Sequence, residues 1–214
     1  FPEDLRAKAL ASLDRLGVKV RTETPVVGID ASGVDLAGGE RIDAATVLWA
    51  AGVAASPLGR MLGAPVDRVG RVMVEPDLTV PGCPDVYVVG DLAHVEQDGR
   101  PLPGVAQVAM QEGAHAVENI LRRFGNQPPR PFRYHDLGNL ATIGRHSAIA
   151  DFGGRWRFAG AFAWWLWLFI HVLKLTGFRN RIAVLIQWAW AYLTQQRGIR
   201  LITGQDPADA PPRS

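Results

Sequence analysis

Residues 86–93 read Val-Tyr-Val-Val-Gly-Asp-Leu-Ala, an apolar run that ends in a glycine and an aspartate. The apolar part predicts a buried strand over residues 86–89. A glycine just past a buried strand lets a ligand approach the backbone, and an aspartate can accept hydrogen bonds from sugar-like hydroxyl groups. Gly90 and Asp91 are therefore candidate ligand-binding residues, although a Gly-Asp pair after a strand is also an ordinary turn.

A long helix is predicted downstream, over residues 104–124, with Arg122 and Arg123 in its last turn. Gln107 and Gln111 lie four residues apart and so share a face of this helix. Its N-terminus offers free N–H groups and the positive end of the helix dipole. Small side chains leave room for a flat group to pack closely, at Ala106, Ala109, Gly113, Ala114 and Ala116. The alternative is a well-packed helix with two solvated glutamines.

The other segments carry weaker signals. Residues 3–16 have apolar side chains at helical spacing, and Gly17 ends the predicted helix. Residues 46–52 form a continuous apolar run that predicts a second buried strand. Further short strands are predicted over 18–21, 26–30 and 33–36. Two more are predicted within 132–151, and Thr142-Ile143-Gly144 belongs to the second of them. Loops are predicted over 81–84 and 125–131.

Charge is distributed unevenly along the chain. The 214 residues include 23 Lys and Arg and 21 Asp and Glu, which gives a formal net charge of +2. Residues 152–205 hold seven of the basic residues and no acidic one, so the remainder, with 16 basic and 21 acidic residues, carries −5. The hydrophobic fraction of 48% excludes a disordered or fibrous chain. We expect no nucleic-acid partner.

The basic segment also contains six of the seven tryptophans. Two apolar runs, 158–175 and 182–193, flank a polar break and predict an amphipathic helical hairpin. A membrane-spanning helix needs about 20 apolar residues, so the hairpin is expected to lie in the membrane interface. The expected membrane contacts are basic or aromatic: Trp164, Trp165, Trp167, Arg179, Arg181, Trp188 and Trp190. The alternative is a hairpin buried in a soluble core or an oligomer interface.

Few other residues suggest chemistry. The single cysteine, Cys83, excludes an internal disulfide, a Cys-x-x-Cys redox pair and a cysteine-based zinc site. The five histidines have no metal-ligand spacing, so no metal is expected. His171 and Lys174 interrupt an apolar run, where ionisable groups are functional candidates, although the lysine can also snorkel to a lipid surface.

Residues 46–52, 86–93 and 106–111, in this order and spacing, resemble the two-dinucleotide-domain flavoproteins. More specifically, they resemble type II NADH dehydrogenases, the single-subunit, non-proton-pumping NADH:quinone oxidoreductases. Residues 177–181 and 188–190 resemble parts of the family's membrane-anchoring helices, and the whole resemblance covers about residues 5–203. It implies an α/β fold: an incomplete FAD/NAD(P)-binding, two-domain, Rossmann-like fold with a C-terminal amphipathic helical hairpin.

The resemblance also implies roles for individual residues. In the family the Gly-Asp pair binds the ribityl chain of FAD, and this pair matches Gly90 and Asp91. An Ala-Gln-x-Ala-x-Gln stretch lies beside the isoalloxazine ring and at the quinone site. The implied cofactor-binding residues are Gly52, Gly90, Asp91, Ala106 and Gln107, and the implied catalytic residues on the quinone and flavin side are Gln107 and Gln111.

One family feature is missing. The sequence contains no Gly-x-Gly, so both dinucleotide fingerprints, which the family carries upstream, are absent. We therefore expect the C-terminal portion of a longer enzyme, inactive alone. The expected parts are the end of the NADH-binding domain (1–50), part of the FAD-binding domain (51–125), a linker with short strands (126–154), a membrane-associating helical segment (155–204) and a disordered tail (205–214).

The resemblance implies that the parent protein transfers electrons from its substrate NADH through FAD to a quinone in the bilayer. It would attach to an anionic membrane surface, on the cytoplasmic face of the inner (plasma) membrane. The resemblance leaves open whether the protein forms a homodimer. One alternative is a soluble FAD-dependent NADH oxidase or reductase of the same superfamily. Another is a membrane-interaction module fused to an α/β domain that has lost its ligand.

Overall fold

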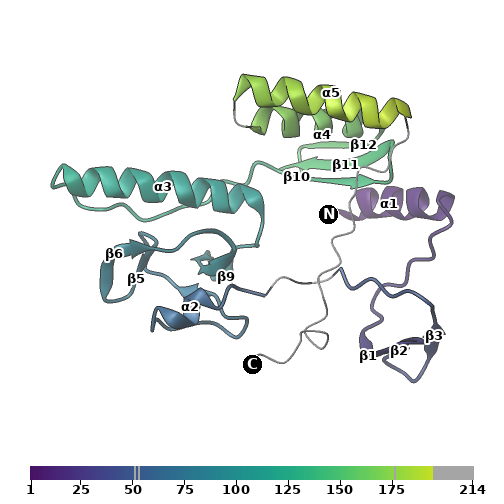
Figure 1. The fold of residues 1–214 in the computed structure, drawn as a ribbon, viewed down its shortest axis with the longest axis horizontal. Coiled ribbons are helices and arrows are strands. Elements are labelled where there is room, and N and C mark those ends of the chain that lie inside the picture. The colour runs from purple at the N-terminus through teal and green to yellow at the C-terminus, as the bar shows by residue number, and fades with distance from the viewer. Residues whose placement is uncertain (51, 53, 176, 195–214) are drawn as a thin grey trace, which may run out of the picture. The chain divides into compact units, whose positions relative to one another are not determined.

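The computed structural model describes residues 1–50, 52, 54–175 and 177–194. The chain folds into two compact units (Figure 1). Among the described residues, one unit contains 1–18, 139–175 and 177–194, and the other contains 19–50, 52 and 54–138.

The first unit is built on an antiparallel three-stranded sheet with a helix on each face. The strands are β10 (Asn139–Ile143), β11 (Ser147–Phe152) and β12 (Trp156–Gly160), paired in that order. Successive side chains of β11 point to opposite faces. Ile149 packs against Leu5 of α1 (Glu3–Arg15), whereas Ala148 and Ala150 pack against Ala163 of α4 (Ala161–Lys174). Both faces are covered, which explains three consecutive buried residues in β11.

A second helix, α5 (Phe178–Thr194), folds back along α4 to form a hairpin, visible at the top of Figure 1. The ring of Trp167 stacks on that of Trp188, with centroids 6.0 Å apart and planes 9° from parallel. The Arg181 Nε donates to the Leu175 carbonyl at 2.8 Å, which closes the connection between the helices. Within the described residues, no helix combines the length and the apolar character needed to cross a membrane.

The second unit begins with an antiparallel meander. Its strands are β1 (Val26–Asp30), β2 (Gly33–Leu36) and β3 (Arg41–Asp43). The Arg41 guanidinium bridges Asp30 at 2.7 Å and Asp35 at 2.8 Å, which ties the three strands together. The expected strands 26–30 and 33–36 are thus confirmed, whereas the expected strand over 18–21 is wrong, because those residues stay outside the sheet and exposed.

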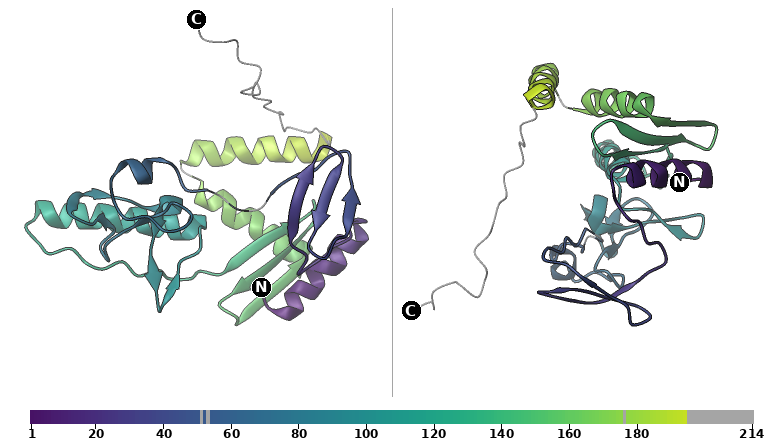
Figure 2. Two further views of the ribbon diagram at one scale, coloured as in Figure 1. Left: turned by 90° about the horizontal axis from the view of Figure 1, so that it is seen from below. Right: turned by 90° about the vertical axis from the view of Figure 1, so that its right-hand side faces the viewer.

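The remainder of the second unit packs short strands against one long helix (Figure 1 and Figure 2). The elements are α2 (Leu58–Met61), β4 (Val72–Met73), β5 (Thr79–Val80), β6 (Cys83–Tyr87), the 3-10 turn η1 (Gly90–Leu92), β7 (Ala93–His94), β8 (Glu96–Gln97), β9 (Arg100–Pro101) and α3 (Ala106–Phe124). β4 pairs with β7 in parallel, and β5–β6 and β8–β9 are antiparallel hairpins. The core is made by Val72, Val80, Val88 and Ala93.

The helix α3 is fixed to its unit by a buried amide. Asn119 is fully buried, accepts the Arg130 N–H at 2.9 Å and donates to the Arg130 carbonyl at 2.9 Å. Its Nδ2 also lies 3.3 Å from the Asp77 carbonyl oxygen. Arg130 lies outside any strand, so its backbone groups need other partners, and the Asn119 side chain provides them. These bonds hold the segment after α3 against the helix.

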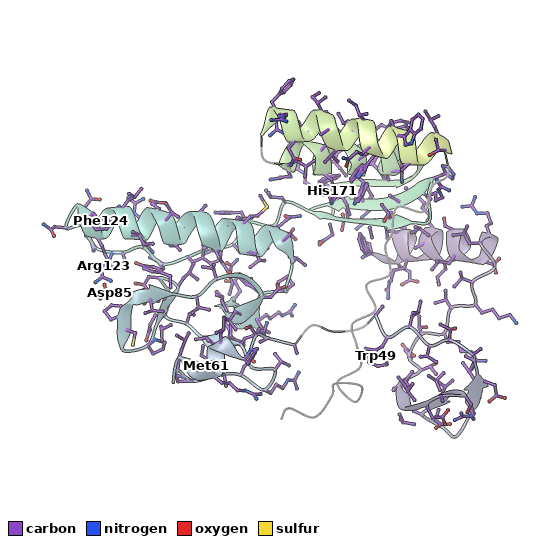
Figure 3. All side chains as sticks on the ribbon, viewed as in Figure 1. Trp49, Met61, Asp85, Arg123, Phe124 and His171 are labelled. Carbon is purple, nitrogen blue, oxygen red and sulfur yellow. The ribbon has the colours of Figure 1, made fainter. Side chains whose placement is uncertain are left out.

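Two predicted strands of the second unit differ from the structure. The run 46–52 is in no strand where it is described, and Leu48 and Trp49 are 87% and 64% exposed; Trp49 is labelled in Figure 3. An apolar run forms a buried strand only beside other strands, and no described strand pairs with it. The strand expected over 86–89 is observed earlier in the chain, as β6 (Cys83–Tyr87). The turn at Gly82, with a φ of +76°, lets the chain pair with β5, so part of the expected loop 81–84 belongs to the strand.

The strand prediction for the first unit also differs from the structure. Two strands were expected within 132–151 and a helical segment from 155, but the sheet has three strands and β12 lies inside the expected helical segment. Gly153 and Gly154, with φ of +60° and +73°, form the turn that folds β12 back onto β11. Residues 142 and 143 belong to the first strand, not the second. The expected tail 205–214 lies outside the described residues.

The compact units divide the chain differently from the expected domains. Helix α1 packs on β10–β12 and not on the meander that follows it in sequence. The expected boundaries refer to the longer family fold and stay a prediction.

Candidate functional site

A pocket of about 390 Å³ lies in the second unit, where η1 meets the first turns of α3. Three of the residues expected to bind a cofactor, Gly52, Gly90 and Asp91, line it together. The full lining is Ala50, Gly52, Val69, Arg71, Gly90, Asp91, Ala93, Leu102, Pro103, Gly104, Val105, Val108, Ala109 and Glu112. Ala106 and Gln107 lie on the same helical turn but do not line the pocket.

Glycines keep the pocket open at two points. Gly90 has a φ of +71°, and a Cβ placed there would lie 3.4 Å from the Cβ of Ala109. A Cβ on Gly104 would lie 3.3 Å from Oδ1 of Asp91. Asp91 is exposed, and its carboxylate accepts no hydrogen bond from any described residue. It is therefore free to accept hydrogen bonds from ligand hydroxyl groups.

The start of α3 has no side-chain cap. Val105 is extended at the N-cap position and offers no capping oxygen. The first N–H groups of a helix have no partner within the helix, so those of Ala106 and Gln107 are available near the pocket rim. Together with the helix dipole they favour a negative group there.

The two glutamines expected at the quinone site hold the segment that follows α3. Gln111 forms two hydrogen bonds with the His135 backbone, at 2.9 and 3.0 Å. The Gln107 Nε2 donates to the Gly138 carbonyl at 2.7 Å, while its Oε1 is buried without a partner among the described residues. Gln97 makes a similar reciprocal pair with the Tyr134 backbone. Both Gln107 and Gln111 therefore donate to backbone carbonyls.

The sequence reasoning missed Glu112, which lies at the back of the pocket. Its side chain is 1% exposed and accepts the Gly90 N–H at 2.5 Å. Burial raises the pKa of Glu112 and the nearby Asp91 raises it further, while the hydrogen bond from Gly90 opposes both. Helical periodicity could have found this residue, because it shares the buried face of α3 with Val108, Ala116 and Asn119.

A second missed group lies beside the pocket. Arg71, which lines the pocket, pairs through Nε with Asp67 Oδ2 at 2.8 Å, and the Nδ1 of His94 lies 3.0 Å from the same oxygen. Burial alone would raise the pKa of Asp67, but hydrogen bonds from the backbone and guanidinium of Arg71 and from His94 hold it well below its usual range. Asp67 and Arg71 are four residues apart, but His94 is far from both in sequence, so no local pattern indicates the three-residue cluster.

The expected membrane residues lie on the α4–α5 hairpin of the other unit. Trp165 and Trp190 are 63% and 62% exposed, and Arg179 is also exposed. Trp164 packs instead against the sheet. An exposed apolar stripe follows both helices at helical spacing, and its members are Phe162, Trp165, Phe169, Leu173, Phe178, Ile182, Ile186, Trp190 and Leu193.

The remaining candidates have simpler surroundings. His171, labelled in Figure 3, is exposed, and its Nδ1 lies 2.8 Å from the Trp167 carbonyl oxygen. Cys83 is free and exposed. No group of three His, Cys, Asp or Glu side chains that could hold a metal ion occurs in the described part of the chain.

The fold and the pocket at the Gly90–Asp91 turn agree with the class of protein that the family comparison identifies. The chain belongs to the pyridine nucleotide-disulphide oxidoreductase family, whose model matches residues 1–113. Residues 136–197 match a second model, the NDH2 C-terminal domain. The expected resemblance to type II NADH dehydrogenases is thereby confirmed.

Two curated relatives of this chain are named as type II NADH:quinone oxidoreductases. The type II NADH:quinone oxidoreductase NdhA of Mycobacterium tuberculosis is 45% identical over 94% of this chain and 44% of its own length. The type II NADH:quinone oxidoreductase Ndh of the same organism is 39% identical over 94% of this chain and 45% of its own. The chain thus spans less than half the length of these curated relatives.

The solved structures agree on the fold. NDH2 from Plasmodium falciparum, solved in complex with NADH, matches with a TM-score of 0.77 and 17% identity, over 94% of this chain and 57% of that one. At this identity the likeness concerns the fold alone, and it confirms the expected Rossmann-like fold with C-terminal helices.

Proposed function

We propose that this chain is the flavin-side and membrane-side portion of an enzyme that transfers electrons from NADH through FAD to a quinone. The observation that carries the proposal is the pocket in which Gly90, Asp91 and the start of α3 converge. The relatives named as type II NADH:quinone oxidoreductases support it along nearly the whole chain.

The pocket residues fit FAD. The free Asp91 carboxylate suits the hydroxyl groups of a ribityl chain, and Gly90 and Gly104 leave space that a Cβ would fill. The N–H groups of Ala106 and Gln107 suit a negative or carbonyl group of the cofactor, and Gly52, which also lines the pocket, would contact it. Bound FAD supplies the electron-transfer chemistry, accepting a hydride from NADH and delivering two electrons to the quinone.

Gln107 and Gln111 are the proposed quinone-side residues. A quinone head group presents two carbonyl acceptors, so it needs donors, and an amide Nε2 is a suitable one. Both amides already donate to backbone carbonyls at Gly138 and His135. Each amide nitrogen carries a second N–H, so a quinone carbonyl can accept from it while the bond to the segment 135–138 is kept.

The α4–α5 hairpin is the proposed membrane contact, at an anionic surface on the cytoplasmic face of the inner membrane. Its exposed apolar stripe would enter the interface, while Arg179 and Arg181 would contact lipid phosphates. Attachment has a functional reason, because the quinone resides in the bilayer. A homodimer formed through the same stripe is the competing use of this surface.

The residue roles can be tested in the full-length protein by comparing Asp91→Ala and Gln111→Ala. We expect Asp91→Ala to lower FAD affinity about tenfold, since it removes charged hydrogen-bond acceptors. Gln111→Ala should keep bound FAD but slow the reduction of a quinone analogue. The exposed Gln127→Ala is the control for both.

Unchanged quinone turnover by Gln111→Ala with FAD bound would show that the quinone-side assignment is wrong. Deletion of residues 155–201 distinguishes the proposed function from the soluble alternative. A soluble NADH oxidase would stay in the same cell fraction after the deletion, whereas a quinone reductase would leave the membrane fraction. Purified full-length protein without flavin would favour a module that has lost its ligand.

A further inference from the structure

The buried carboxyl group of Glu112 has no part in the proposed function above. It is 1% exposed, lines the pocket and accepts the Gly90 N–H. No basic side chain in the described residues forms an ion pair with it. A glutamate is rarely buried without a partner, because desolvating a charge costs several kcal/mol. Its place on an otherwise apolar and amide face of α3 therefore requires a reason.

One reason is the turn that Glu112 holds. Gly90 begins η1 with a φ of +71°, and the next residue, Asp91, is the one that faces the pocket. The carboxyl group links this turn to α3 through the Gly90 amide. Without that acceptor, the amide N–H would be left unsatisfied against the helix and the turn would lose its anchor.

A second reason is the charge of the pocket. The other ionisable side chains that line it are Asp91 and Arg71, and Arg71 is committed to Asp67 at 2.8 Å. The carboxyl group of Glu112 thus faces a like charge across a partly enclosed space. Burial and this like charge both favour its protonated form. The protonated group keeps a carbonyl oxygen that can still accept the Gly90 N–H.

We propose that Glu112 is a positioning residue: it fixes the Gly90–Asp91 turn through the Gly90 amide, and it takes up a proton from solvent when an anionic dinucleotide enters the pocket. The identity of the ligand rests on the proposed function, whereas the bond to Gly90 does not. A negative ligand makes the ionised carboxylate less favourable still, so binding and proton uptake are coupled.

The test compares two substitutions in the full-length protein. Glu112→Gln keeps an acceptor for the Gly90 N–H but cannot ionise, and Glu112→Leu fills similar space without an acceptor. The exposed Glu118→Gln, on the same helix, is the matched control. FAD affinity is measured by flavin fluorescence from mildly acidic to mildly alkaline pH, and exchange of the Gly90 amide proton is measured by NMR without flavin.

We expect the affinity of the wild type and of Glu118→Gln to fall as pH rises, by roughly tenfold if FAD raises the pKa of Glu112 by one unit. Glu112→Gln should bind FAD tightly with no such dependence and should keep the Gly90 amide protected. Glu112→Leu should lose roughly tenfold in affinity and most of that protection while remaining folded by circular dichroism.

Two results would overturn the proposal. Equal FAD affinity and equal Gly90 protection in Glu112→Leu would exclude the positioning role. Identical pH dependence in the wild type and in Glu112→Gln would exclude the proton uptake. Wild-type protein that binds no FAD contradicts the proposed function instead, and the exchange of the Gly90 amide then still decides the positioning role.

Discussion

At the residue scale, Asp67 joins two chain segments through one carboxylate. It accepts hydrogen bonds from Arg71 and lies 3.0 Å from Nδ1 of His94 in β7. Because its pKa in the folded state is lowered, its contribution to stability is present above the ordinary aspartate pKa of about 3.9 and is lost as pH falls below it.

We therefore expect Asp67→Asn to reduce the free energy of unfolding by about 1–3 kcal/mol at neutral pH. The deficit should shrink as pH falls below about 4, because the unfolded wild type takes up a proton there while the folded Asp67 resists it. Urea unfolding at both pH values measures this, with the exposed Asp14→Asn as the control. A deficit that is equal at the two pH values would mean that the charge contributes nothing.

Asn119 makes a second prediction at this scale. Its amide bonds both backbone groups of Arg130, so Asn119→Ala removes the side-chain acceptor of the Arg130 N–H and leaves the carbonyl with His115 Nε2, 2.8 Å away. The expected loss is about 3 kcal/mol of unfolding free energy, measured by thermal or urea unfolding. The exposed Gln127→Ala should change it by less than about 0.5 kcal/mol. A similar small effect of Asn119→Ala would show that the segment around Arg130 is held by other contacts.

At the scale of elements, the α4–α5 hairpin presents apolar side chains that its own unit does not cover. Replacing Trp165 and Trp190 together by Glu should lower partition into anionic lipid vesicles about 100-fold or more, since each buried Trp contributes about 1.5–3 kcal/mol. Vesicle co-sedimentation of the full-length protein measures this. The same change at Trp156, which is exposed and belongs to β12 rather than to α4 or α5, is the matched control. Equal partition of both variants would instead favour an interface between protein copies.

Helices were more predictable than strands. The expected helices 3–16 and 104–124 begin within two residues of α1 and α3, because helical periodicity and terminal residues are local signals. Strands depend on partners that a sequence does not name. The run 46–52 is apolar enough for a strand but has no described neighbour, whereas β12 forms because Gly153 and Gly154 return it to β11.

At the scale of the whole molecule, the resemblance to a family located the pocket better than the composition did. The end of an apolar run already indicates Gly90 and Asp91, the resemblance adds Gly52 and the cofactor, and all three residues line one pocket. The resemblance did not indicate Glu112, whose burial depends on the packing of α3 over η1, or Arg71, which contacts both the nearby Asp67 and the distant His94. The glutamines were placed on the correct helix, but their bonds to 135–138 follow from tertiary folding alone.

The central claim is that the full-length protein passes electrons from NADH through FAD to a membrane quinone. The most direct measurement is NADH oxidation coupled to reduction of a quinone analogue by FAD-loaded, full-length protein on anionic vesicles. We predict quinone-dependent turnover that falls when Asp91→Ala lowers the bound FAD. NADH oxidation that proceeds equally without quinone and delivers its electrons to oxygen, or no NADH oxidation at all with FAD bound, would contradict the account.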